Sequence, residues 1–121
     1  MIKLTFCLRR LPHLSRDEFQ RYWREQHAPL VAKHAQTLGI LRYVQAHTGH
    51  DALNGAMQAS RGGPDAYDGV AELWFESEAA MAANTSEAAV KAGAELLEDE
   101  QKFIDLARSP LWFSDEHVIT G

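Results

Sequence analysis

The residues of this chain best suited to chemistry lie around His27. Phe19, Trp23 and His27 recur at four-residue spacing, which places their side chains on one face of a helix. An imidazole at the end of such an apolar face is suited to general acid or base catalysis, or to hydrogen bonding with a substrate. The alternative is a core histidine bonded to a nearby carbonyl group. Burial disfavours the imidazolium and a helix C-terminus favours it, so the pattern leaves the charge of His27 open.

Three polar side chains further along the chain supply a second set of candidates. Tyr43, Gln45 and His47 alternate within one expected strand and therefore point to the same side of it. They form either the polar lining of a pocket or the hydrophilic side of an edge strand. We favour the edge strand.

Two other reactive side chains are expected to have structural roles. Glu72 lies on an expected strand, where a carboxylate pairs more readily than it acts alone, so we expect it to pair with Lys3 or Arg9. Cys7 shares a strand face with Thr5, and no feature indicates a lowered pKa. We therefore expect Cys7 to be a small buried residue rather than a nucleophile.

Signatures of metal, phosphate and serine chemistry are incomplete. His47 and His50 lack a third ligand at helical or hairpin spacing, and His27 and His34 span a proline, so a zinc site is not expected. The segment 60–63 has glycines but lacks the Gly-Lys-Ser/Thr ending of a phosphate loop. No nucleophile elbow for a Ser/His/Asp triad is present.

The elements that must position these residues begin with a strand over 2–9, in which apolar and polar side chains alternate. A capping-box sequence at 15–18 then predicts the start of a helix. Pro29 has no N–H group and disfavours helical geometry in the residue before it, so we expect the helix to kink or restart there. A second helical segment, about 30–38, should end at Gly39.

The second half of the chain contains two strands, an alanine-rich helix with one pause, and a last strand. The expected ranges are 40–48, 70–76, about 78–97 with a pause at 84–86, and from 111 onward. Residues 49–68 show no sustained period, and this length is unusual for a structureless connection. We expect a flexible loop, a lid or a partner-contact segment there.

The order strand, helix, strand, strand, helix, strand is typical of an α+β, ferredoxin-like βαββαβ sandwich with an antiparallel four-stranded sheet. Helices would cover one face of that sheet. The other face would carry Val70, Glu72 and Trp74, and apolar surface left in water costs about 25 cal/mol per Å². We therefore expect a homodimer through this open face, in which two sheets form a dimeric α/β barrel.

Length and charge narrow the function further. The 121 residues suit one domain, 1–121, with 45% hydrophobic and 24% charged residues. The net charge is -5, and residues 1–50 hold 8 Lys/Arg against 3 Asp/Glu whereas the rest hold 4 against 14. The overall sign argues against binding to nucleic acid. No targeting sequence or membrane-spanning stretch is evident, so we expect a cytoplasmic protein without a membrane partner.

Several segments form a distinctive combination: the first strand, the start of the first helix, the aromatic pair before the histidine, and three later stretches. They are Ile2 to Arg10, Leu14 to Phe19, Tyr22-Trp23 with His27-Ala28-Pro29-Leu30, Gly39-Ile40 with Tyr43-Val44-Gln45, Val70 to Phe75, and Glu116 to Ile119. In these segments the chain resembles the EthD family of the dimeric α/β barrel superfamily. The family is named for a protein encoded beside a cytochrome P450 system for ethyl tert-butyl ether degradation.

The resemblance implies a kind of site. Relatives in the superfamily include cofactor-free isomerases, polyketide cyclases, decarboxylases and monooxygenases that act on small aromatic or lactone compounds, so no cofactor is expected. His27 resembles the histidine placed after the first helix in a muconolactone isomerase relative, which implies a catalytic role. The small hydrophobic ligand should contact six side chains, Leu4, Phe6, Trp23, Tyr43, His47 and Leu73.

The resemblance also implies a different class of function, an accessory protein with no chemistry of its own. Such a protein would partner an oxidase or a cytochrome P450 degradation system, or carry its hydrophobic substrate. Residues 49–68 would then be the contact element and His27 would be dispensable. A heme or flavin enzyme is a third interpretation, against which a colourless purified protein would count.

Overall fold

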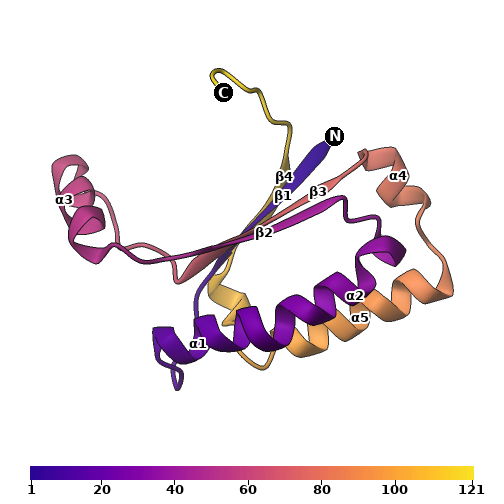
Figure 1. The fold of residues 1–121 in the computed structure, drawn as a ribbon, viewed down its shortest axis with the longest axis horizontal. Helices are drawn as coiled ribbons and strands as arrows, with labels where there is room; N and C mark the ends of the chain where they lie inside the picture. Colours follow the sequence, from indigo (N-terminus) through magenta and orange to yellow (C-terminus); the bar gives the residue numbers. More distant parts are fainter.

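The computed structural model describes residues 1–121 as an antiparallel four-stranded sheet with a layer of helices on one face (Figure 1). The strands and helices are β1 (Ile2–Leu8), α1 (Arg16–Tyr22), η1 (Trp23–His27), α2 (Ala28–Leu38), β2 (Arg42–His47), α3 (Asp51–Arg61), β3 (Gly69–Phe75), α4 (Glu78–Ala83), α5 (Glu87–Glu100), η2 (Leu106–Arg108) and β4 (Leu111–Ser114). The strand order is β2-β3-β1-β4, with every neighbouring pair antiparallel. The predicted α+β fold class is confirmed. None of the helices combines the length and apolar character that crossing a bilayer requires.

The first helical stretch begins where the capping box predicts. The Ser15 hydroxyl accepts a hydrogen bond from the Glu18 amide at 3.1 Å, and the Glu18 carboxylate accepts one from the Ser15 amide at 3.0 Å. After α1 the chain makes one π-helical turn, η1, and α2 then restarts at Ala28 with Pro29 in its first turn. The restart is as expected, but Ala28 keeps helical angles, φ −57° and ψ −43°. The wider π turn bonds the Ala28 amide to the Trp23 carbonyl and so lets the helix continue through Pro29.

The core lies between β1, β3 and the helices. Phe19 and Trp23 are almost fully buried against Phe6 and Phe103. Trp23 lies so close to β3 that a Cβ atom added at Gly69 would clash with its ring. A glycine at that point in the strand is therefore required for the indole to pack flat against the sheet.

Residues 49–68, expected to be a loop without regular structure, contain helix α3. It extends from the end of the sheet, away from the layer formed by α1, α2 and α5 (Figure 1), and none of its residues is buried. Arg16 holds its first turn through two hydrogen bonds of 2.8 Å to the Asp51 carboxylate. The expectation of no regular structure was wrong because the apolar stripe of this helix is short, Leu53 and Met57, and Gly55 between them weakens the helix signal.

The alanine-rich segment is divided as predicted, into α4 and α5. Ser77 and Ser86 cap the two helices, each accepting a hydrogen bond from the amide three residues on. Helix α5 ends at Glu100, three residues later than expected. The extra turn carries Asp99 and Glu100 into the space beneath the sheet, where they become part of the site.

Candidate functional site

A cavity of about 230 Å³ lies between the sheet and the helix layer. Sixteen residues line it, and fourteen of them are hydrophobic. Five of the predicted ligand contacts are among these, namely Leu4, Phe6, Trp23, Tyr43 and Leu73. The two remaining lining residues are His27 and Glu100, so an apolar cavity carries one imidazole and one carboxyl group.

The imidazole of His27 is held at the end of η1. The residue is 5% exposed, and its ring packs against Phe103 with 5.0 Å between centroids. Nδ1 lies 2.7 Å from an oxygen of Asp99, which is also buried. The π turn brings His27 over the last turn of α5, and this makes the pair possible. The histidine is thus buried and hydrogen-bonded, to a carboxylate instead of the expected carbonyl group, and it also lines a cavity.

The second partner of Asp99 decides which nitrogen of His27 carries the hydrogen. The Tyr22 hydroxyl donates a hydrogen bond of 2.6 Å to the same carboxylate. Burial alone would raise the pKa of Asp99, but the hydrogen bonds from Tyr22 and His27 outweigh it and lower the pKa. An ionised carboxylate only accepts, so Nδ1 of His27 must donate. Nε2 is then the basic nitrogen of the ring.

His27 is neutral at physiological pH. Burial lowers the pKa of its imidazole below the usual 6.5, although the hydrogen bond and charge of Asp99 oppose this. Nε2 has no hydrogen-bond partner within the chain, whereas every side-chain nitrogen and oxygen fully shielded from solvent has one. Nε2 is therefore accessible, and it can accept a proton from a molecule in the cavity.

Glu100 is a site residue that the sequence reasoning missed. Its carboxyl group has no hydrogen-bond partner, and burial, with the nearby charge of Asp99, raises its pKa to about 7. Asp99 was missed as well, because both stand in the acidic run 95–100 and resemble a solvated helix face. The available signal was spacing: Asp99 continues the buried face of α5 seven residues after Ala92, and Glu100 lies four residues after cavity-lining Leu96.

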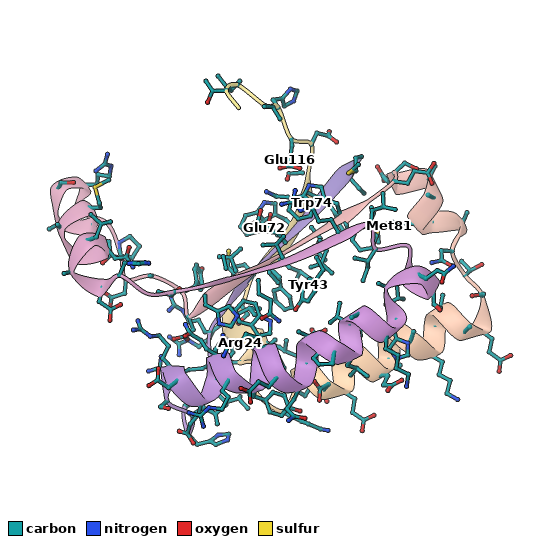
Figure 2. The ribbon with its side chains drawn as sticks, viewed as in Figure 1. Arg24, Tyr43, Glu72, Trp74, Met81 and Glu116 are labelled. Carbon is teal, nitrogen blue, oxygen red and sulfur yellow. The ribbon has the colours of Figure 1, made fainter.

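The polar side chains of β2 face the helices instead of solvent. Tyr43 lines the cavity and lies between sheet and helices in Figure 2, and burial raises the pKa of its hydroxyl. Gln45 donates hydrogen bonds to the Trp23 carbonyl at 3.0 Å and to Tyr43 at 2.7 Å. His47 lies outside the cavity lining and stacks on Trp23, with 4.4 Å between ring centroids. β2 is an edge strand, as expected, but the expectation that these side chains face solvent is wrong, and His47 is a neighbour of the site.

Glu72 and Cys7, which were expected to have structural roles, lie in structural positions. The Lys3 ammonium lies 2.6 Å from the Glu72 carboxylate, so Glu72 is paired as expected. Cys7 is buried, and burial raises the pKa of its thiol. A thiol with a raised pKa is a poor nucleophile.

Trp74 lies on the open face, across the sheet from the cavity, together with Glu72 and Glu116 (Figure 2). Its ring is flanked by the cations of Lys3 and Arg42, at 5.4 and 4.7 Å from the ring. Its indole nitrogen donates a hydrogen bond to Glu116 in the C-terminal segment. The open face thus carries an aromatic side chain within a network of charges.

The strand order and the cavity beneath the sheet define the class: a small α+β protein with a ligand-sized space between helices and sheet. The chain belongs to the EthD domain family, whose sequence model matches residues 11–107. No curated protein sequence matches it significantly.

Solved structures similar to this chain include two of the same family. An EthD family protein from Bacillus halodurans C-125 has a TM-score of 0.60 and 19% identity, over 97% of this chain and 99% of that one. An EthD-like protein from Ralstonia eutropha JMP134 has a TM-score of 0.61 and 20% identity, over 98% and 94%. HapK from Hahella chejuensis has a TM-score of 0.59 and 12% identity, over 100% and 96%. At these identities the likeness establishes a shared fold.

Proposed function

We propose that the protein binds a small apolar compound in the cavity and transfers a proton to or from it through His27, as a cofactor-free catabolic enzyme of the cytoplasm. The observation that carries the proposal is the hydrogen-bonded chain of Tyr22, Asp99 and His27 opening into an apolar space. A carboxylate on Nδ1 fixes the tautomer and the orientation of the ring, which is how a histidine is prepared to act as a general base at Nε2.

The size and lining of the cavity indicate the ligand. An empty apolar cavity of about 150 Å³ is sufficient to hold benzene. The cavity here, about 230 Å³, therefore suits a compound somewhat larger than one six-membered ring. Its fourteen hydrophobic residues offer no partner to a strongly charged ligand. An aromatic, alicyclic or lactone compound fits.

The test is ligand-induced stabilisation, measured as the melting temperature in the presence of phenol, 2-cyclohexenone and γ-butyrolactone. We expect at least one of them to raise the melting temperature by a few degrees at saturating concentration. Ala71→Leu fills the cavity and should abolish the shift. Val70→Leu, the matched control on the opposite face of β3, should retain it.

Two results would count against this function. One is the absence of a shift with every compound. The other is an equal shift in the wild type and Ala71→Leu, which would place the ligand elsewhere. If the shift is lost in Ala71→Leu and kept in His27→Ala, the cavity binds ligand but His27 does not anchor it.

We further propose that two copies associate through the open face of the sheet, around Val70, Glu72 and Trp74. No helix covers this face (Figure 1), and Trp112 on β4, the strand beyond β1, is 48% exposed. With the half-buried Val70 and Trp74 it forms a partly exposed apolar surface, of the kind typical of interfaces. The charge network around Trp74 would then be enclosed between two sheets.

Sedimentation velocity tests the association. The wild type should sediment as a dimer, and Val70→Glu should sediment as a monomer. Leu53→Glu, at an exposed position of α3, is the control and should remain dimeric. A dimer that survives Val70→Glu and is lost in Leu53→Glu would move the interface to α3.

One observation favours the accessory role, in which the protein assists an oxidase of an ether-degrading system. Helix α3 buries none of its residues and exposes Leu53 and Met57 one turn apart. Loss of oxidase binding in the double variant Leu53→Ser, Met57→Ser, with binding kept in His27→Ala, would support that role. Unchanged binding in both variants would exclude α3 as its contact element.

A further inference from the structure

We propose that Glu100 is a second catalytic group of the cavity, an acid that acts opposite the base His27 on a carbonyl compound with an acidic C–H bond. This inference rests on the proposed function of the same site. His27 and Glu100 are the two non-hydrophobic members of the sixteen residues that line the cavity. Neither the Glu100 carboxyl group nor Nε2 of His27 has a hydrogen-bond partner within the chain. Since every fully shielded polar side-chain atom has one, both groups are open to a molecule in the cavity.

The electrostatic surroundings set the state of each group. The titratable groups around Glu100 are Asp99 on its own helix, His27 on η1 and Tyr43 on β2, and none of them is a cation at neutral pH. Glu100 therefore has nothing to stabilise its anion, and with a pKa of about 7 it keeps its proton in a large part of the molecules at neutral pH. His27, fixed by Asp99, is a proton acceptor under the same conditions.

The pair defines the complementary ligand. The Glu100 carboxyl group donates a hydrogen bond, so the ligand needs an acceptor for it. Nε2 of His27 accepts a proton, so the ligand also needs an acidic hydrogen. A neutral carbonyl compound supplies both, since the carbonyl oxygen accepts and acidifies the hydrogens of the adjacent carbon. The apolar walls exclude compounds that need several hydrogen bonds. The substrate class is an unsaturated ketone or lactone that isomerises by a 1,3-proton transfer.

The reaction moves protons and a double bond only, so it needs no oxidant or reductant. His27 Nε2 takes the proton from the carbon between the carbonyl and the double bond, as the Glu100 carboxyl proton passes to the carbonyl oxygen and a dienol forms. The imidazolium then returns its proton to the far carbon of the diene. The enol O–H returns its proton to the Glu100 carboxylate. The double bond has moved into conjugation, and both side chains are restored.

The experiment uses 3-cyclohexenone as the probe, with conversion to 2-cyclohexenone followed by ultraviolet absorbance and by NMR in D₂O. His27→Ala and Glu100→Gln should each lower kcat by about 100-fold or more. Glu98→Gln, an exposed carboxylate on the same helix, is the matched control and should leave kcat unchanged. Glu100→Asp keeps the acid one methylene further away and should restore part of the rate.

The pH profile separates an acid from a merely structural residue. Wild-type kcat should fall at low pH as His27 is protonated and at high pH as Glu100 loses its proton. Glu100→Gln should lack the high-pH limb. A profile that keeps this limb in Glu100→Gln would overturn the assignment.

The outcomes also distinguish this inference from the proposed function. If isomerisation depends on His27 while Glu100→Gln behaves like Glu98→Gln, the role of Glu100 is overturned and the function stands. If 3-cyclohexenone raises the melting temperature but is neither isomerised nor deuterated, the proton-transfer chemistry is overturned and ligand binding stands. If neither 3-cyclohexenone nor any of the three compounds tested for the proposed function binds to the cavity, both are overturned.

Discussion

The two faces of the sheet use polar side chains in opposite ways. Between the sheet and the helices, the half-buried Tyr22 and the buried Asp99 and His27 form one short hydrogen-bonded chain, and the Glu100 carboxyl group has no hydrogen-bond partner. On the open face Lys3 pairs with both Glu72 and Glu116, and water can reach all three side chains. Burying a polar group is costly, whereas exposed pairs are nearly neutral in free energy. The polar residues buried on the covered face are therefore the ones whose positions indicate a function.

The largest expected effect is the loss of an aromatic side chain from the covered face. Trp23→Ala should lower the free energy of unfolding by about 3–5 kcal/mol, because it removes a fully buried indole and leaves a cavity. Trp112→Ala, the same change on the open face, should cost less than about 1 kcal/mol in a monomer. Urea unfolding measures both. Equal losses would erase the distinction between the faces.

The second-largest loss of stability is expected from removing the Asp99 carboxylate, which joins Tyr22 and His27. Asp99→Ala leaves the buried His27 and the half-buried Tyr22 hydroxyl without their acceptor, and we expect a loss of about 2–4 kcal/mol in urea unfolding. It should also lower the pKa of His27 further, since the anion that raises it is gone. NMR titration of the imidazole measures this shift. Glu98→Ala is the exposed control, and a similar result for both variants would contradict the arrangement.

A smaller effect, opposite in sign, is expected at Glu100. The folded pKa of about 7 exceeds the usual 4.5, so burial of the acid form contributes stability below pH 4.5 that is lost as the pH rises through 7. Glu100→Gln carries no charge and should be more stable than the wild type at pH 8, by about 1–3 kcal/mol. The two should be equally stable near pH 4. Thermal unfolding at the two pH values tests this, and a gain at pH 4 would refute the assigned cause.

The smallest effect is expected on the open face. Lys3→Met breaks the partly exposed pair with Glu72, and in a monomer pairs that water reaches contribute about 0–1 kcal/mol, less at high salt. Lys33→Met on the exposed side of α2 provides the baseline. A loss well above this range that grows with protein concentration would show that the open face is enclosed in a dimer.

Local signals were sufficient for most element boundaries. The capping box at Ser15 and Glu18 and the left-handed Gly39, with φ 74°, act within one turn of chain, so a sequence displays them completely. The spacing of Phe19, Trp23 and His27 likewise predicted a buried helix face, and all three are buried. Helix α3 was missed because its apolar stripe is only Leu53 and Met57, and because Gly55 between them weakens the helix signal.

By itself the sequence determined the α+β fold class and the buried aromatic face that ends at His27. These depend on residue type and spacing over a few residues. Only the tertiary structure decided the partner of His27, because Asp99 lies 72 positions away and looks like one carboxylate in an acidic run. It also decided that Glu100 faces an apolar cavity, since a solvated carboxylate and a buried one have the same letter in a sequence and differ only in what packs around them.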